Sequence, residues 1–358
     1  MKKKGRVIVG MSGGIDSTIA VHLLQKEGYE VLGATLRLAD HYIKEQSKQS
    51  RVIERAKAVC DNFGIEHVVA DRTREFDNCV VRYFADAYFN GRTPNPCVQC
   101  NVFLKWKELL HMADERDIDY VATGHYARVE KYGRRFRLLK GRDTKKDQSY
   151  FLWRLNQEEL SRTVFPLGDL KKTDVRVLAE ELQLPQSGQS ESQDICFIND
   201  NDYRKFLEEH FPERVKSIGQ GTFIDKENTV IGHHGGYHRF TTGQRKGLRI
   251  AMGKPVYVRK IDPENNFVLI TDAAGMEDVS CRITATNWIA MEKPVKNINA
   301  RVKVRYRNKG GPCRIAPIDG SDYRIDFLET QKAVTPGQSA VFYDNDRVLG
   351  GGIIVGPE

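Results

Sequence analysis

Three cysteines are the side chains of this sequence whose spacing most clearly allows chemistry. Cys97 and Cys100 form a C-x-x-C pair at the start of an expected helix, and Cys196 follows in a distant Gln/Ser-rich stretch. A thiol at a helix start is expected to have a lowered pKa, which favours the reactive thiolate. A structural zinc site needs four ligands, and the sequence holds no second C-x-x-C. We interpret the three cysteines as functional, while half a zinc site completed by His125, or plain loop cysteines, stay open.

The cysteine count argues against a disulfide framework. Seven cysteines is an odd number in a chain with no secretion signal, so metal or redox chemistry is the better interpretation. The remaining four occupy helical or strand patterns and are interpreted as core or bystander residues: Cys60, Cys79, Cys281 and Cys313.

A glycine-rich loop is the second chemical feature. The apolar run 7–9 predicts a strand, Ser12-Gly13-Gly14 a tight loop, and the residues after Ser17 a helix capped by Asp16 or Ser17. Free backbone N–H groups and the positive end of a helix bind phosphate. No Gly-Lys-Ser/Thr closes the loop, so it is not a Walker A motif. Asp16 either caps the helix or holds Mg²⁺, and the sequence does not decide between them.

The six residues Ser-Gly-Gly-Ile-Asp-Ser resemble the SGGxDS signature of the PP-loop ATP pyrophosphatases. Members of that superfamily cleave ATP between the α- and β-phosphates and adenylate an oxygen of their substrate. The resemblance implies that the loop binds ATP with Mg²⁺. The broader family resemblance given below implies that Leu36 and Gly124 lie near the nucleotide. The expected loop residues are Gly10, Met11, Ser12, Gly13, Gly14, Ile15, Asp16 and Ser17.

The elements that must position these residues follow from periodicity. Strands are expected at 31–36, 67–70 and 120–123, and helices at 52–63, 76–87 and 101–112. Residues 39–49 predict a polar loop, and two prolines make 92–99 irregular. Alternating strands and helices predict an α/β, doubly wound parallel sheet with ligands at the carboxyl ends of its strands.

Beyond residue 123 the regular alternation of expected strands and helices ends. Residues 127–139 predict a hairpin that turns at Tyr132-Gly133, and helices are expected at 175–182 and 202–211. Helical patterns vanish after about residue 215, and short strands dominate from about residue 282, including the alternating run 302–307. We expect three domains: a PP-loop domain at 1–212, a small mixed or β domain at 213–278, and a C-terminal β-barrel at 279–358.

Composition limits the partners and the compartment. The 358 residues carry a formal charge of +8, and an excess of cations permits a polyanionic partner such as nucleic acid. The apolar run after Lys2–Lys4 is too short for a signal peptide, and no long apolar stretch follows. We therefore expect a cytoplasmic protein with no membrane partner.

Nine motifs in order make the resemblance more specific. They span residue 10 to near the C-terminus and read GMSGGIDS, GRTPNPCVQCN, ATGHYAR, KDQSYFL, SQDICFI, TTGQRKGL, VRYR, VTPGQSAVFY and LGGGII. Together they resemble the tRNA 2-thiouridine synthases, also called tRNA-specific 2-thiouridylases. The resemblance implies ATP-dependent 2-thiolation of the wobble uridine of tRNA. The uridine C2 oxygen is adenylated with release of pyrophosphate, and sulfur then displaces AMP.

The resemblance also implies residue roles. Asp16, Cys100 and Cys196 are the expected catalytic residues, with Cys196 as the persulfide carrier and Cys100 as its nucleophilic partner, ending as a transient disulfide. Asn95, Pro96 and Cys97 meet the target base. Further tRNA contacts are expected at His125, Lys146, Asp147, Gln148, Arg305, Tyr306 and Gln338. Lys146–Gln148 could equally be a solvated helix cap, and Arg305 could lie on the solvent-exposed face of an edge strand.

Cys97 departs from the family pattern, in which many members carry an aspartate with an acid/base role. Cys97, Cys100 and Cys196 would give three thiolates, which can hold a [4Fe–4S] cluster with one open iron for the sulfide. Cluster and persulfide mechanisms therefore both stay open. The sulfur donor, whether a persulfide relay protein, a cysteine desulfurase or free sulfide, is not readable from the sequence.

The sequence leaves two alternative functions open. A PP-loop synthetase that forms an amide or another carbon–nitrogen bond would have no use for the three cysteines, and its ATP cleavage would depend on a small amine. A non-catalytic tRNA-binding or iron–sulfur protein would bind tRNA without forming AMP. The intact SGGIDS loop argues against the second alternative.

Overall fold

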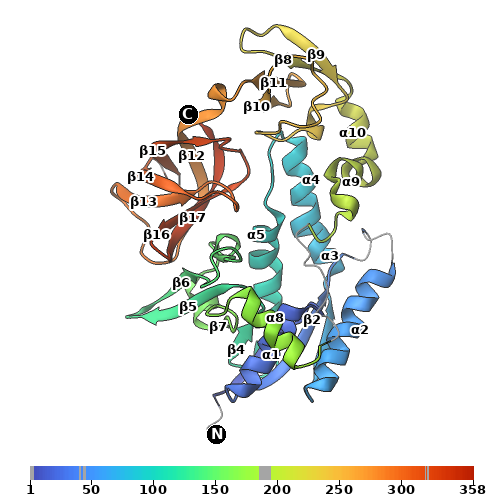
Figure 1. The fold of residues 1–358 in the computed structure, drawn as a ribbon, viewed down its shortest axis with the longest axis vertical. Helices are drawn as coiled ribbons and strands as arrows, with labels where there is room; N and C mark the ends of the chain where they lie inside the picture. The colour runs from blue at the N-terminus through green and yellow to red at the C-terminus, as the bar shows by residue number, and fades with distance from the viewer. Residues whose placement is uncertain (1–3, 40–41, 43–45, 185–194, 319, 321) are drawn as a thin grey trace. The chain divides into compact units, whose positions relative to one another are not determined.

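The computed structural model describes residues 4–39, 42, 46–184, 195–318, 320 and 322–358. The chain divides into two compact units (Figure 1). The first holds Met1–Val80, Cys97–Asn199 and Asp346–Leu349, and the second holds Val81–Pro96, Asp200–Asn345 and Gly350–Glu358. In the described residues, no helix is long and apolar enough to cross a bilayer.

A five-stranded parallel sheet organises the first unit. Its strands are β1 (Arg6–Gly10), β2 (Glu30–Arg37), β3 (His67–Asp71), β4 (Tyr120–Ala122) and β7 (Thr163–Val164), in the order β3-β2-β1-β4-β7. Every pairing within it is parallel. The order reverses between β1 and β4, which is the switch point where doubly wound sheets bind ligands. The predicted strands and the predicted fold class are confirmed.

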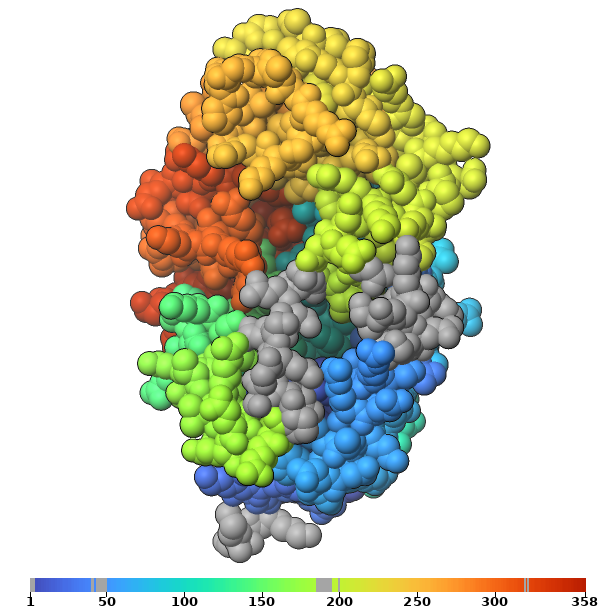
Figure 2. All heavy atoms as spheres, turned by 45° about the vertical axis from the view of Figure 1, so that its right-hand side comes forward, coloured from blue at the N-terminus to red at the C-terminus, as the bar shows by residue number. Residues whose placement is uncertain are grey.

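Helices cover this sheet because their apolar faces match its buried strands. Val7, Val9, Val21 and Leu24 share one buried core with the inner face of the helix over residues 46–62. Figure 2 shows the outer face of that helix at the surface of the unit. The helices of the first unit are α1 (Ile15–Lys26), α2 (Gln46–Asn62), α3 (Thr73–Phe76), α5 (Pro96–Cys100), α6 (Lys107–Asp114), α7 (Gln157–Ser161) and α8 (Lys172–Glu181).

Two π-helical turns, η1 (Asp77–Val81) and η2 (Asn101–Trp106), interrupt the helical segments that the periodicity predicts as continuous. The expectation that 92–99 is irregular was wrong at its end, because α5 begins at Pro96. Proline is tolerated at the first helical position, where its missing N–H costs no hydrogen bond. The predicted loop 39–49 is wrong at its end, because α2 begins at Gln46. Residues 40–41 and 43–45 of that loop, and 185–194 of the Gln/Ser-rich stretch, lie outside the described residues.

An antiparallel hairpin also belongs to the first unit. It consists of β5 (Ala127–Tyr132) and β6 (Arg135–Lys140), with Tyr132 opposite Arg135 at its tip. The predicted turn is confirmed. Figure 1 shows the hairpin as an arm of the first unit.

The second unit contains a closed barrel and a smaller sheet. The barrel strands are β12 (Glu277–Trp288), β13 (Ile298–Lys303), β14 (Gly311–Pro317), β15 (Tyr323–Lys332), β16 (Ser339–Asp344) and β17 (Arg347–Pro357), and β12 pairs with β17 to close it. The smaller sheet has the order β10-β11-β8-β9. Its strands are β8 (Gly221–Ile224), β9 (Val230–His234), β10 (Tyr257–Asp262) and β11 (Phe267–Thr271), and the helices of this unit are α4 (Arg82–Phe89), α9 (Tyr203–His210) and α10 (Pro212–Ile218). The predicted C-terminal barrel is confirmed, but the expected strand 302–307 ends at Lys303, and residues 304–307 form bends and turns.

Candidate active site

The glycine-rich loop joins β1 to α1 at the switch point of the sheet. Gly13 has φ +67, a conformation that favours glycine. Gly14 is the N-cap of α1 and makes no side-chain cap bond. The carbonyl of Gly14 instead accepts from the hydroxyls of Ser17 at 3.0 Å and Thr18 at 2.9 Å. The prediction that Asp16 or Ser17 caps α1 is therefore wrong, because the Ser17 hydroxyl turns back into the first helical turn.

The serines of the loop hold its backbone in place. The Ser12 N–H donates to Ser17 Oγ at 3.3 Å, and the two hydroxyl oxygens are also 3.3 Å apart. The Met11 N–H donates to Ala34 O of β2 at 2.7 Å. The loop is thus tied to the ends of two neighbouring strands, which is the placement expected for a phosphate-binding loop.

Gly124 lies directly against this loop. A Cβ on Gly124 would stand 2.9 Å from the Asp16 carbonyl carbon and 3.0 Å from the Ser17 nitrogen. The structure therefore brings Gly124, after β4, beside the residues after β1, as the strand order predicts. Leu36 comes from the end of β2, which pairs with β1 through Gly10 and Ala34.

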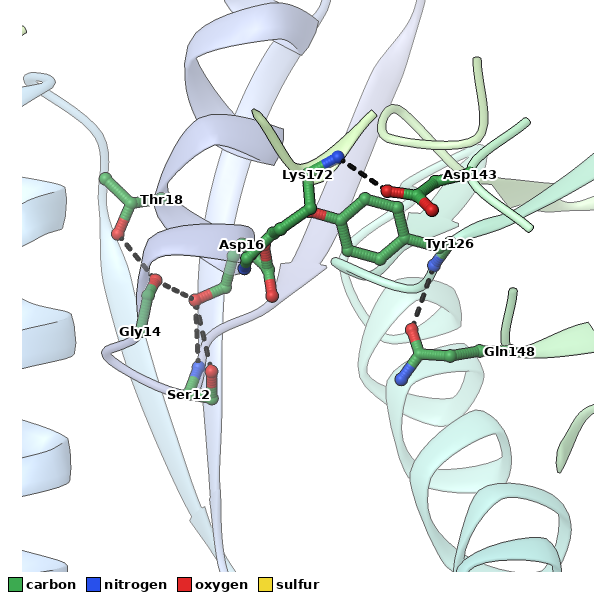
Figure 3. A network of polar contacts seen from close by, with 9 residues as sticks. Ser12, Gly14, Asp16, Thr18, Tyr126, Asp143, Gln148 and Lys172 are labelled. Carbon is green, nitrogen blue, oxygen red and sulfur yellow. Dashed lines mark hydrogen bonds and ion pairs between the residues drawn. The ribbon is translucent and has the colours of Figure 1, made fainter. Parts of the chain in front are cut away.

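The Asp16 carboxylate has partners that the sequence does not reveal. Its Oδ1 accepts from Lys172 Nζ at 2.6 Å and from the Tyr126 hydroxyl at 2.8 Å, and Figure 3 shows the three side chains side by side. The Lys172 side chain is 9% exposed, whereas Asp16 is 36% exposed. Lys172 is the first residue of α8, and its backbone N–H donates to Asp143 at 2.9 Å.

Lys172 and Tyr126 are thus site residues that sequence reasoning missed. One signal pointed to Lys172. A cation in the first turn of a helix opposes the helix dipole, so a lysine at that position calls for an anionic partner. Tyr126 gave no signal of this kind.

The three predicted cysteines share one neighbourhood of the first unit. Cys97 and Cys100 come from α5, and Cys196 comes from the loop before α9. Cys100 is a buried residue, whereas Cys97 and Cys196 are exposed as residues. The charges of Cys97 and Cys196 each act on Cys100, so residues about a hundred positions apart in sequence interact within one site.

The expected lowering of the thiol pKa was wrong. Desolvation is the largest influence, and it raises the pKa of Cys100 to about 12 and that of Cys196 to about 11. It also raises the pKa of Cys97. Desolvation disfavours the charged thiolate, and here it outweighs the benefit of the helix start.

Lys105 supplies a cation to this neighbourhood, and sequence reasoning missed it as well. It lies in η2, one π-helical turn after Cys100, and it lowers the pKa of all three thiols. Desolvation is the largest influence on the Lys105 ammonium and lowers its pKa, but the charges of the three cysteines outweigh it and raise the pKa. Lys105 is therefore placed to stabilise a thiolate.

No three Cys, His, Asp or Glu side chains in the described residues converge to hold a metal ion. The three thiols share a neighbourhood without forming such a ligand set. The predicted iron–sulfur ligation thus stays a prediction.

His125 lies three residues after the end of β4, within reach of the Lys105 charge. Its Nδ1 is hydrogen-bonded to Thr123 Oγ1 at 2.8 Å, and its ring packs against Trp106 and Phe165. Desolvation, followed by the charge of Lys105, lowers the pKa of His125 to about 3. The imidazole is therefore neutral at physiological pH and can meet a base as an uncharged ring.

Two of the predicted tRNA contacts brace the chain after the hairpin. The Asp147 carboxylate is buried and accepts from the N–H groups of Gly141 at 3.1 Å and Ser149 at 3.0 Å. Gln148 Oε1 accepts from the Tyr126 N–H at 2.9 Å. The alternative of a solvated cap does not describe Asp147. Contact with tRNA stays a prediction here, as it does for Lys146.

Predicted tRNA contacts also lie in the second unit. Gln338 Nε2 donates to Thr93 O at 3.1 Å and to Pro94 O at 3.0 Å, so it holds the loop that leads into Asn95 and Pro96. Arg305 is exposed in the turn after β13, and Lys303 Nζ lies 5.8 Å from the Tyr306 ring centroid. Arg305 is therefore not on the face of an edge strand.

A parallel sheet with a glycine-rich loop at its switch point, followed by a small β domain and a closed barrel, defines a multidomain α/β nucleotide-binding protein. Three family profiles match the chain in this order. A tRNA methyl transferase HUP domain matches residues 5–200, a tRNA methyl transferase PRC-barrel domain 204–272, and an aminomethyltransferase β-barrel domain 279–354.

Curated relatives match nearly the whole chain. The tRNA-specific 2-thiouridylase MnmA of Chlorobium luteolum is 44% identical over 99% of this chain and 97% of its own length. MnmA 1 of Caldanaerobacter subterraneus is 44% identical over 99% of both chains. The chain belongs to the tRNA-specific 2-thiouridylase family. Among solved structures, the U34-tRNA thiolase NcsA of Methanococcus maripaludis, described with its [4Fe–4S] cluster, is 20% identical over 60% of this chain and 68% of its own, with a TM-score of 0.36.

Proposed function

We propose that this chain catalyses ATP-dependent 2-thiolation of the wobble uridine of tRNA. The observation behind the proposal is its membership of the 2-thiouridylase family, with relatives 44% identical across 99% of the chain. The family assignment makes the chain an enzyme that uses ATP to place sulfur on a tRNA uridine. It leaves no reason to prefer a carbon–nitrogen-forming synthetase or a non-catalytic binding protein.

The first step is adenylation at the glycine-rich loop. The N–H groups of the loop and of the α1 N-terminus bind the ATP phosphates, and the uridine O2 attacks the α-phosphate with loss of pyrophosphate. Asp16 is 36% exposed, and one carboxylate together with substrate phosphates is a usual environment for Mg²⁺. When bound there, Mg²⁺ would neutralise charge on the departing pyrophosphate. Lys172 holds the Asp16 carboxylate in position through its 2.6 Å contact.

The second step is sulfur transfer at the three cysteines. The C2–O bond of a urea-like base is a poor leaving bond until the oxygen carries AMP. The terminal sulfur of a Cys196 persulfide attacks C2 and displaces AMP, and Cys100 then breaks the S–S bond to form a disulfide with Cys196. An external dithiol must then reduce the disulfide. Lys105 stabilises the anionic sulfur, and the target base leaves the anticodon stack to reach it.

A cluster-bound sulfide is the alternative sulfur source, and the thiol set of Cys97, Cys100 and Cys196 favours it chemically. Thiolates are the usual ligands of [4Fe–4S] clusters. A bound cluster would supply an open iron that carries the sulfide. Within the described residues the three thiols do not form a metal-holding group.

Several finer assignments complete the proposal. We retain the three-domain division at 1–212, 213–278 and 279–358, the cytoplasmic location, and the tRNA contacts at Asn95, Pro96 and Cys97 as proposals. The sulfur donor is a persulfide relay protein, a cysteine desulfurase or free sulfide.

The test uses anaerobically purified protein, unmodified tRNA, Mg-ATP and sulfide, with 2-thiouridine measured by nucleoside mass spectrometry and AMP measured in parallel. Thiolated product is the expected result with sulfide if a cluster carries the sulfur. The Cys196 persulfide route needs a persulfide donor in place of sulfide, because sulfide does not form a persulfide without an oxidant, and the iron content of the same sample distinguishes the two routes. AMP release without thiolated product, through hydrolysis of the adenylated uridine, points to a missing sulfur relay. The absence of both products contradicts the proposal.

A further inference from the structure

The tip of the β5–β6 hairpin is a basic and aromatic surface that none of the roles above uses. Residues 130–137 contain four cations, Lys131, Arg134, Arg135 and Arg137, and a single carboxylate, Glu130. Glu130 lies 3.7 Å from Arg137. Lys131 and Arg134 are exposed, and within the described residues neither has a carboxylate partner.

An aromatic ring stands among these cations. The Tyr132 side chain is 61% exposed, and the Arg137 guanidinium lies 3.2 Å from its ring centroid. A stacked guanidinium fixes the ring at the hairpin tip. An exposed ring beside cations is the combination that nucleic-acid surfaces use for stacking and phosphate contact.

The tip is braced against the rest of the first unit. Gln157, the first residue of α7, accepts from the Phe136 N–H at 2.8 Å and donates to the Phe136 carbonyl at 2.9 Å. The capping box of Asn156 and Glu159 fixes the start of this helix. A surface held in this way loses little conformational entropy on binding.

The hairpin also starts at the candidate site. β5 begins two residues after His125, and β6 ends beside Gly141, whose N–H binds Asp147. A six-residue strand spans about 20 Å. The tip therefore lies about one strand length from residues expected to meet the target nucleotide, a distance that suits contact with a neighbouring part of the same polyanion.

We propose that Lys131, Arg134 and Tyr132 at the hairpin tip form an additional tRNA contact, which binds the phosphate–ribose backbone away from the target uridine. This inference rests on tRNA being the substrate. The contact is electrostatic and independent of base sequence, so it contributes affinity and orientation while the chemistry occurs elsewhere.

The test compares two variants that lose the same charge. K131Q/R134Q removes the cations of the tip, and K26Q/K57Q removes two exposed lysines from α1 and α2. Binding of unmodified tRNA to the full chain is measured at several salt concentrations. We expect the hairpin variant to bind about tenfold more weakly, with the slope of log K against log salt reduced by about 1 to 2, and the control to stay within about twofold.

Two further readouts make the outcome decisive. At saturating tRNA the hairpin variant should release AMP at the wild-type rate, with a raised KM for tRNA, and an equal melting temperature excludes misfolding. The Y132A variant should lose part of the backbone protection from hydroxyl radicals outside the anticodon loop. Unchanged affinity and salt slope in K131Q/R134Q overturn the inference. If wild-type protein itself fails to bind tRNA, the proposed function fails instead.

Discussion

The glycine-rich loop and the cysteine neighbourhood of the same unit are organised by opposite physical means. In the loop, polar groups pair with one another: Asp16 with Lys172 and Tyr126, and Ser12 with Ser17. Around the cysteines, desolvation dominates and raises the pKa of every thiol. In the glycine-rich loop the charged and polar groups already have partners. In the cysteine neighbourhood Lys105 can stabilise a sulfur anion once one forms.

The difference indicates a division of labour between the two steps. A nucleotide with several charges needs fixed donors before it binds, since reorganising them would cost free energy. A thiol must stay protonated until its substrate is activated, because a free thiolate would react with any electrophile or oxidant. Burial of Cys100 thus protects the sulfur, and the nearby ammonium lowers the barrier to its ionisation.

Replacement of a sulfur carrier should give the largest effect. Cys196→Ser is expected to reduce 2-thiouridine formation by roughly 10³-fold or more, because it removes a covalent step, while adenylation of the uridine with release of pyrophosphate continues. Nucleoside mass spectrometry and pyrophosphate assays on one sample measure both. Cys60→Ser, at a buried core cysteine outside the site, serves as the matched control. Unchanged thiolation in Cys196→Ser would refute its role.

Replacement of the Asp16 carboxylate in the loop should slow adenylation rather than sulfur transfer. Asp16→Asn keeps the side-chain volume but removes the charge that pairs with Lys172, and AMP formation should fall on the order of 10²-fold with tRNA affinity unchanged. The measurement is single-turnover AMP release alongside tRNA binding. Lys172→Met and the double variant complete a cycle, in which non-additive losses show that the two residues act together. Wild-type AMP formation in Asp16→Asn would remove Asp16 from the mechanism.

Removal of the ammonium near the thiols should have a smaller, pH-dependent effect. Lys105 stabilises the thiolates, so Lys105→Met raises their pKa further and moves the alkylation profile to higher pH. Because the pKa of Cys196 is already about 11, iodoacetamide should modify it slowly at pH 8, and the variant should react about tenfold more slowly still. Peptide-resolved mass spectrometry follows the rate between pH 7 and 11. Lys107→Met, at an exposed neighbouring position, is the control, and a profile unmoved by Lys105→Met contradicts this role.

The smallest effect is expected outside the two regions. Arg305→Ala in the second unit should weaken tRNA binding a few-fold and reduce the salt slope by about 1, leaving both chemical steps intact at saturating tRNA. Filter binding at several salt concentrations measures the slope. Arg324→Ala, on β15 of the same barrel, tests whether the effect is local. A slope that does not change would count against the barrel as an RNA surface.

The sequence predicts the loop region well because its determinants are local. The strand before Gly10, the glycines after it and the apolar spacing of α1 all lie within twenty residues. The partner of Asp16 could not be predicted, since Lys172 is 156 positions away and only the packed α8 brings it close. The thiol pKa was predicted with the wrong sign for a related reason. A helix start is a local feature, but desolvation depends on every neighbour in space.

The same limit applies to the helices around the cysteines. Apolar spacing predicts that residues 101–112 are helical, yet it cannot distinguish a π-helical turn from an α-helical one. The strand expected at 302–307 is predicted too long, because the alternation of apolar and basic residues continues past Lys303 although the chain turns there.

The π-helical turn η2 affects the helical register between α5 and α6. In an α-helix each residue advances about 100° around the axis, and a π turn holds one residue more than an α turn. Because the extra residue is accommodated within one turn, deletion of a single residue from Asn101–Trp106 would restore an α-helical turn and leave α5 and α6 in nearly the same orientation. Cys97 and Cys100 would keep their direction relative to His125, whereas a deletion from a regular α-helical turn would rotate them by about 100°. The segment therefore tolerates the loss of one residue in this turn far better than a loss elsewhere between the cysteines and α6.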